Sequence, residues 1–215
     1  MSEMRHRMMM AMMSGSTSLP FDSFVQWLEA PSAQSYIDTE VPGQSGLEIG
    51  MTVEIFTPVQ YAPIFGNYID EAHNCCRIIV ANNTGNNFYC NNNTKAGGPL
   101  SFDATADSRM QLYIGSTFAN YSKGRGYTNI PTSEGTENQS HIALFQRSVS
   151  TLSSFCATVR CYLFWIRKNG EYLRYMMPVR VGTTGYMYDG VSGRLFGSIG
   201  TDDFNIGADV PLIHL

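Results

Sequence analysis

The sequence predicts an all-β fold, a sandwich or barrel of short antiparallel strands joined by tight turns. Three observations lead to this expectation. The chain of 215 residues contains 12 Tyr, 12 Phe and 20 Gly, residue types that are typical of strands and turns. Short segments in which apolar and polar residues alternate recur between turn signals. Neither heptads, nor repeats of solenoid length, nor β–α–β units occur in the pattern.

Composition predicts one sizeable domain and excludes two classes of partner. An all-β domain of this length is ordinary, and 43% hydrophobic residues can fill its core. The formal net charge of −4 argues against a nucleic-acid binder, which needs a basic surface. No run reaches the roughly 18 apolar residues of a membrane-spanning helix. The five cysteines do not resemble a disulfide framework, so folding in a reducing cytosol is expected.

Residues 1–20 are expected to form an N-terminal arm and linker, and residues 21–215 the sandwich domain. Residues 1–13 hold seven of the twelve Met, and a Ser/Gly-rich linker follows at Ser14–Ser18. The apolar run Met8–Met13 is shorter than a signal-peptide core of about 7–15 residues. Because Met fills irregular grooves, the arm is expected to dock on a neighbouring subunit; the alternative is that it folds back on its own domain. The residues expected to drive assembly are Arg5, Arg7, Met8, Met9, Met10, Met12 and Met13.

The first half of the domain is expected to contain six strands. Their segments alternate or are continuously apolar, and they are Ser35–Thr39, Met51–Thr57, Ile64–Gly66, Arg77–Ala81, Phe88–Cys90 and Met110–Gly115. Seven Asn within Asn82–Asn93 predict loops on both sides of the fifth strand. The polar, Gly/Ser/Thr-rich stretch Tyr121–Gly135 predicts a surface loop.

The clearest local pattern lies near the C-terminus. Cys156–Ile166 alternates, which predicts one common face for Ala157, Val159, Cys161, Leu163 and Trp165. Asn169–Gly170 predicts a two-residue hairpin turn, because both central residues of that turn need positive φ. The returning strand is Glu171–Val181, in which Pro178 indicates a bulge or an edge position. Shorter strands are expected at Tyr186–Tyr188, Arg194–Phe196 and Phe204–Ile206.

Four segments carry more specific motifs: Leu28–Thr39 (LEAPSAQSYIDT), Pro63–Gly66 (PIFG), Tyr162–Arg180 (YLFWIRKNGEYLRYMMPVR) and Gly185–Phe204 (GYMYDGVSGRLFGSIGTDDF). They resemble the LamG-like, concanavalin A-like jelly-roll domains of phage and prophage virion proteins from gut bacteria. The closing segment is the most specific part of a resemblance that spans about residues 25–207. It implies an antiparallel jelly-roll β-sandwich that acts as a structural virion protein, in capsid decoration, a fibre or the tail.

The sequence carries no recognisable catalytic motif. Glycoside hydrolases of similar fold need two carboxylates facing each other, whereas Asp70–Glu71 and Asp202–Asp203 are adjacent pairs that point to opposite faces of an extended chain. The four His lack metal-ligand spacing, and neither a nucleophile elbow nor a phosphate-binding loop occurs. We therefore expect no enzymatic activity, no cofactor and no metal.

Two functions lead, and a secreted bacterial surface lectin is a third, weakened by the lack of a convincing signal peptide. The first is the structural virion protein, made in the host cytoplasm and assembled with other virion proteins and further copies of itself. The second is an adhesin that binds glycans of the host surface, since lectin-like sandwiches recognise sugars through aromatic rings beside polar groups. The candidate carbohydrate-binding residues are Asn87, Phe88, Tyr89, Tyr121, Lys123, Arg125 and Tyr127.

Overall fold

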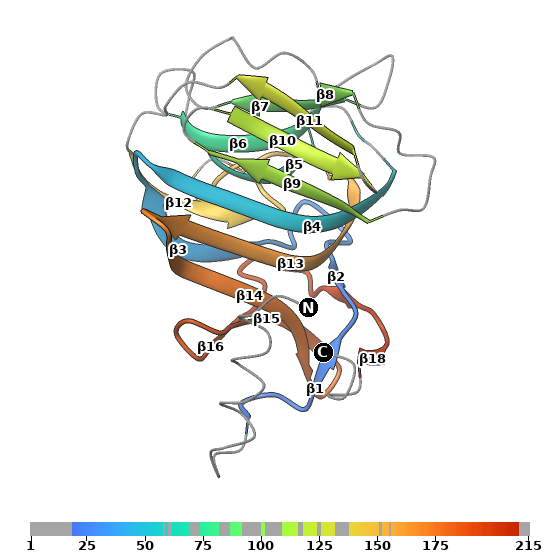
Figure 1. The fold of residues 1–215 in the computed structure, drawn as a ribbon. Coiled ribbons are helices and arrows are strands. Elements are labelled where there is room, and N and C mark those ends of the chain that lie inside the picture. Colours follow the sequence, from blue (N-terminus) through green and yellow to red (C-terminus); the bar gives the residue numbers. More distant parts are fainter. Residues whose placement is uncertain are drawn as a thin grey trace.

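The computed structural model shows two antiparallel sheets packed face to face, so the predicted all-β sandwich is confirmed (Figure 1). It describes residues 19–57, 59, 62–68, 74–81, 87–91, 100–101, 109–115, 118–123, 126–131, 138–150, 152–154 and 156–210. Within these residues every element is a strand, and none is a helix that could cross a membrane.

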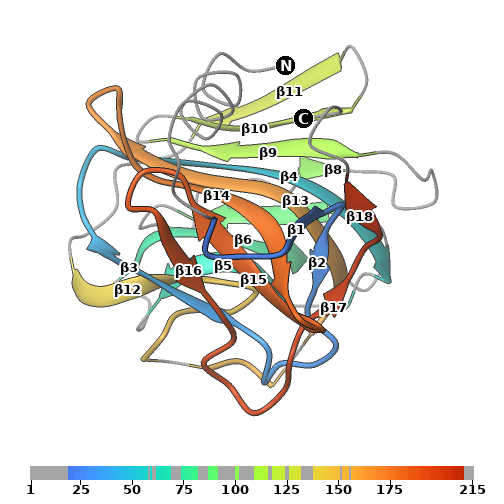
Figure 2. The same cartoon turned by 90° about the horizontal axis from the view of Figure 1, so that it is seen from below.

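The larger sheet has twelve strands. In chain order they are β1 (Ser23–Val25), β2 (Leu28–Glu29), β4 (Leu47–Thr57), β9 (Met110–Ile114), β10 (Phe118–Lys123), β11 (Gly126–Pro131), β13 (Thr158–Lys168), β14 (Glu171–Val181), β15 (Thr184–Asp189), β16 (Arg194–Phe196), β17 (Asn205–Ile206) and β18 (Asp209–Val210). The main path runs β11-β10-β9-β4-β13-β14-β1-β18. Figure 2 shows β15 beside β14 and β16, with which it pairs, while β2 joins β13 to β17.

The smaller sheet has six strands in the order β3-β12-β5-β6-β7-β8. Their bounds are β3 (Ile37–Gly43), β5 (Pro63–Tyr68), β6 (Asn74–Ala81), β7 (Asn87–Asn91), β8 (Leu100–Ser101) and β12 (Asn138–Leu144). All expected strands of the first half of the domain therefore exist, although several begin or end a few residues from the predicted limits.

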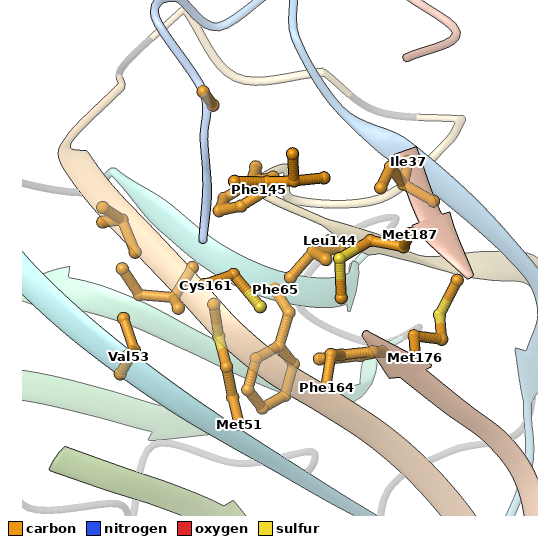
Figure 3. Packing of buried hydrophobic residues seen from close by; sticks show 14 of the residues in the cluster. Ile37, Met51, Val53, Phe65, Leu144, Phe145, Cys161, Phe164, Met176 and Met187 are labelled. Carbon is orange, nitrogen blue, oxygen red and sulfur yellow. The ribbon is translucent and has the colours of Figure 1, made fainter. Parts of the chain in front are cut away.

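The main core fills the space between the two sheets. Figure 3 shows its tightly packed centre, where Phe65 from the smaller sheet meets Phe164 from the larger one, with ring centres 5.7 Å apart. The other labelled members are Ile37, Met51, Val53, Leu144, Phe145, Cys161, Met176 and Met187. Burial raises the pKa of the Cys161 thiol well above its usual value, so this side chain behaves as a small apolar group.

The hairpin predicted at Asn169–Gly170 is confirmed. The two residues have φ of 52° and 84°, and Lys168 pairs with Glu171 across the turn. This turn aligns β13 with β14 at the centre of the larger sheet. These two strands and the neighbouring β4 are the longest in the structure, with 11 residues each.

The expected surface loop at Tyr121–Gly135 is wrong for much of its length. β10 and β11 pair from Phe118 with Pro131 to Lys123 with Gly126, and this hairpin extends the larger sheet beyond β9. Among the described strands, β11 pairs with β10 alone. Because a strand at the edge of a sheet can be polar, composition alone does not distinguish it from a polar loop.

The expected face of β13 is wrong beyond Cys161 because the strand contains a β-bulge. Opposite β4, Cys161 pairs with Val53 and Leu163 pairs with Thr52, so Tyr162 is an extra residue. An extra residue reverses the inward and outward positions that follow it.

The reversal decides which side chains of β13 enter the core. Phe164 and Ile166, together with Cys161, belong to the core between the sheets. Leu163 and Trp165, which alternation had placed beside Cys161, lie instead on the opposite face of the sheet.

Pro178 occupies neither a bulge nor an edge strand, contrary to the sequence interpretation. On one side it pairs with Met187 of β15. On the other side it falls between the last pair with β13, at Met176, and the first pair with β1, at Val179. The missing N–H of Pro178 therefore coincides with the change of neighbouring strand.

The closing segment folds around a buried carboxylate. Asp189 is fully buried, and its Oδ1 accepts hydrogen bonds from the backbone N–H groups of Tyr175 (2.8 Å) and Val191 (3.2 Å). Its Oδ2 accepts a hydrogen bond from the Ser192 hydroxyl at 2.7 Å and lies 3.8 Å from Arg174 Nη1. These contacts fix the turn between β15 and β16 without any ligand.

Candidate functional site

The face of the larger sheet that points away from the smaller sheet carries many large apolar side chains. Along β14 and β15, Met176 and Met187 lie in the core, whereas the neighbouring Tyr175, Met177 and Tyr188 lie on the opposite face. We call this group the outer aromatic layer. Its members are Leu19, Phe21, Phe24, Leu163, Trp165, Tyr172, Tyr175, Met177, Val179, Tyr186, Tyr188, Leu195 and Val210.

A second bulge concentrates the rings of this layer. The pairing of β13 with β14 skips Leu173, which packs against the core. Tyr172 and Tyr175, three positions apart, therefore lie on the same face, and their rings meet edge to face at 5.4 Å.

Trp165 continues the row of rings toward β4. Its ring centre lies 5.9 Å from that of Tyr172 and 6.0 Å from that of Tyr113 on β9. Trp165 pairs with Gly50 of β4, where an added Cβ would lie only 2.2 Å from the indole ring. A side chain at Gly50 would displace the indole, so the glycine makes room for it.

Polar groups gather around Glu48 beside this row. The Glu48 carboxylate accepts hydrogen bonds from Arg167 Nε at 2.7 Å and from the Tyr113 hydroxyl at 3.1 Å. Burial and the negative charge of Glu48 raise the pKa of Tyr113 to about 12. Tyr113 therefore stays a neutral hydrogen-bond donor at physiological pH.

A cation–aromatic stack lies on the same face at β2 and β4. The guanidinium carbon of Arg160 lies 4.0 Å from the ring centre of Trp27 and 4.3 Å from that of Phe56. Arg160 Nε also donates to Glu29 at 3.0 Å, and Asn205 donates to the other oxygen of Glu29 at 3.1 Å. The stack ties β2, β4, β13 and β17 together.

Glu54, further along β4, has a similar set of neighbours. The Tyr162 hydroxyl donates a hydrogen bond to Glu54, and the guanidinium carbon of Arg109 lies 4.0 Å from the Tyr162 ring centre. Burial and the bond to Glu54 raise the pKa of Tyr162 to about 12. The extra residue of the β13 bulge is thus held by a carboxylate and a cation.

The two carboxylates of β4 do not have the spacing of a glycosidase pair. Glu48 and Glu54 are six positions apart on one strand, roughly 20 Å, whereas glycosidase carboxylates are about 5–10 Å apart. Both carboxylates already have Arg and Tyr neighbours. In the described part of the chain, no three His, Cys, Asp or Glu side chains gather to hold a metal ion.

The residues predicted to bind carbohydrate lie on strands of both sheets. Asn87, Phe88 and Tyr89 are on β7 of the smaller sheet, whereas Tyr121 and Lys123 on β10 and Tyr127 on β11 belong to the larger sheet. All three strands lie toward the same end of the sandwich (Figure 1). The side chains of these residues, and Arg125 as a whole, lie outside the described residues. The same holds for the assembly residues Arg5, Arg7, Met8, Met9, Met10, Met12 and Met13.

The sequence interpretation missed the outer aromatic layer. Alternation alone placed Trp165 in the core, because a bulge leaves no clear signal in a single sequence. One indication was available: in Glu171–Val181 the large apolar residues Tyr172, Leu173, Tyr175, Met176 and Met177 supply both faces of the strand. A strand that is apolar on both faces is covered on both sides.

Comparison with known proteins adds no relative. Neither a scan against models of protein families nor a search of curated proteins gives a match for this chain.

Proposed function

We propose that this chain is a non-enzymatic structural protein of a bacteriophage particle, joined to the particle by residues 1–20 and displaying its sandwich domain. The observation that supports the proposal best is the fold of Gly185–Phe204, the most specific part of the resemblance to virion domains. This segment supplies β15, β16 and the turn around Asp189, and it is held by hydrogen bonds within the protein.

The proposal names its partners and its location. The partners are other virion proteins and further copies of this chain; nucleic acid and membrane are not among them. The protein is made in the host cytoplasm and ends in the particle, in capsid decoration, a fibre or the tail. The outer face of the larger sheet suits contact with another virion protein. Its carboxylates are hydrogen-bonded to Arg and Tyr side chains, and its rings pack against one another.

The test is a quantitative mass-spectrometry inventory of purified particles. Particles are produced with the full chain, with a chain lacking residues 1–14, and with a chain in which these residues are replaced by a Gly/Ser sequence of equal length. We expect the full chain at a fixed copy number, and both altered chains to fold but stay outside the particle. Absence of the full chain from particles contradicts the structural role, and normal incorporation of the truncated chain contradicts the anchor.

The second candidate function is recognition of a host-surface glycan by the same domain. The observation that favours it is the location of β7, β10 and β11, which carry the predicted sugar-binding residues, at one end of the sandwich (Figure 1). Tyr89→Ala and Tyr127→Ala should abolish binding on a glycan array. The matched control is Phe56→Ala, which removes a 39% exposed ring elsewhere and should leave binding intact. An array without any bound glycan contradicts this function.

A further inference from the structure

The outer face of the larger sheet changes character between β4 and β14. A strand with one solvated face is expected to be apolar inward and polar outward, and β4 follows this rule with Glu48, Thr52 and Glu54. The outward residues of β14 do not follow it: Tyr175 is 2% exposed and Val179 is fully buried. These side chains of β14 are therefore already covered, whereas Trp165, Tyr172 and Tyr188 of the same layer are only half-buried.

The polypeptide chain enters the described part of the structure at this layer. Leu19, the first described residue, packs against it. The Phe21 ring lies 5.0 Å from Tyr188 and 4.8 Å from Phe24, measured between ring centres. Residues 1–18 are thus tethered beside the half-buried rings of the layer.

The length of residues 1–18 is sufficient for this task. Eighteen residues span up to roughly 60 Å when extended. The layer crosses from β1 over β14 to β13, which is about 10 Å at the usual spacing between strands. A segment tethered this close has an effective concentration on the order of millimolar, which favours its own domain over an external partner.

The side chains of the segment also suit the layer. Residues 1–13 contain seven Met, and the layer consists largely of Tyr, Trp and Phe rings. The flexible thioether of Met adapts to irregular surfaces and makes favourable contacts at the edges of aromatic rings. Arg5 and Arg7, in the same segment, can stay in solvent while the Met side chains pack.

We propose that the Met-rich segment 1–18 packs on the outer aromatic layer of its own domain in the free protein. Under the proposed function, this packing would store the anchor against the sandwich until a particle is available. This inference concerns the isolated chain and does not depend on the role in a particle, so the two are tested separately.

Acrylamide quenching of tryptophan fluorescence tests the inference. The chain has two Trp, so Trp27→Phe leaves Trp165 of the layer as the only reporter. Removing residues 1–18 from this variant should raise the quenching constant at least twofold. The control is Trp165→Phe, which reports on Trp27 beside Arg160 and should show no change on truncation.

Two full-length variants keep the test valid where the truncated chain aggregates. Replacing the Met at positions 4, 8, 9, 10, 12 and 13 by Ser should raise the quenching of Trp165 as truncation does. The control Arg5→Gln/Arg7→Gln should leave it low, because the charges are not part of the packed surface. Equal quenching of Trp165 in the parent chain and the Ser variant overturns the inference and leaves the layer open to an external partner.

Light scattering with size-exclusion chromatography shows whether the segment that packs on the layer comes from the same chain or from a neighbouring copy. Low quenching in a monomeric fraction supports packing within one chain. Low quenching that is lost on dilution, together with a dimer, assigns the cover to a neighbouring copy and overturns the inference. Either result leaves the particle inventory, and with it the proposed function, unaffected.

Discussion

The two halves of the outer face of the larger sheet show how one sheet can meet two environments. Over β4 and β9 most outward side chains are charged or polar, as at Glu48 and the exposed Gln111, with Phe56 as an exception. Over β14 and β15 they are aromatic or aliphatic, as at Tyr175 and Tyr188. Trp165 lies at the boundary, with its ring over Gly50 of β4.

The difference shows that burial on this face follows from neighbours outside the sandwich core. The core between the sheets explains the burial of the inward residues in both halves equally well. Among the described residues, fully buried outward side chains such as Val179 occur on the β14 side. If the apolar half is a packed second core, its residues should contribute to stability as core residues do, whereas the polar half should tolerate substitution.

The largest expected effect compares one residue from each half. Tyr175→Ala removes a ring that is 2% exposed and should lower the free energy of unfolding by about 3–5 kcal/mol. Gln111→Ala, on the exposed side of β9, should change it by less than about 0.5 kcal/mol. Equilibrium unfolding in denaturant measures both values. Equal losses for the two variants would show that the halves do not differ.

The next effect concerns the turn that closes the apolar half. Asp189→Ala removes the acceptor of the Tyr175 N–H and of the Ser192 hydroxyl, and should cost about 2–3 kcal/mol. The control Asp203→Ala removes an exposed carboxylate in the same closing segment and should be close to neutral. A small loss for Asp189→Ala in thermal or chemical unfolding would mean that the turn forms without its carboxylate.

How far the sequence predicts the structure also differs between regions. Alternation predicted β4, β9 and the β13–β14 hairpin, because local apolar patterns and the Asn169–Gly170 turn specify them without distant contacts. It failed for the hairpin of β10 and β11, whose polar composition is compatible with both an edge strand and a loop. Edge strands lack the burial that gives central strands their pattern.

The candidate site was harder to predict than the fold. The bulges at Tyr162 and Leu173 determine which rings reach the outer aromatic layer, and each is a difference of one residue in the pairing with another strand. Such a register depends on contacts between strands that are distant in the chain. The residues proposed for sugar binding and assembly stay predictions, since their side chains lie outside the described part of the protein.

A smaller effect is expected at the hairpin that joins the central strands. Gly170 has φ of 84°, and nothing lies within 4 Å of the position that a Cβ would take. Gly170→Val should therefore act through the backbone alone and lower stability by about 1–3 kcal/mol, because a β-branched residue resists positive φ. Gly170→Asn should cost less, since Asn tolerates this conformation. Equal melting temperatures for the Val variant and the parent would show that the assigned turn is wrong.

The smallest expected effect is a loss of stability at high pH, which comes from the titration of a tyrosine in the polar half. The pKa of Tyr113 is raised from 10.0 to about 12 by burial and by Glu48. Between these values the unfolded chain has released the phenolic proton while the folded chain still holds it. Stability from this group is therefore complete below pH 10 and falls as the pH rises toward 12.

Tyr113→Phe isolates this contribution. The variant has no proton to release at position 113, so its stability should fall less steeply between pH 10 and 12 than that of the parent. Denaturant unfolding at a series of pH values gives the two slopes, and the ultraviolet absorbance of tyrosinate follows the proton directly. Tyr162→Phe should reduce the slope in the same way, because Glu54 and burial raise the pKa of Tyr162 to about 12 as well. Identical slopes for the parent and Tyr113→Phe would show that the phenol beside Glu48 titrates as it does in the unfolded chain, and that this half of the face is open to water.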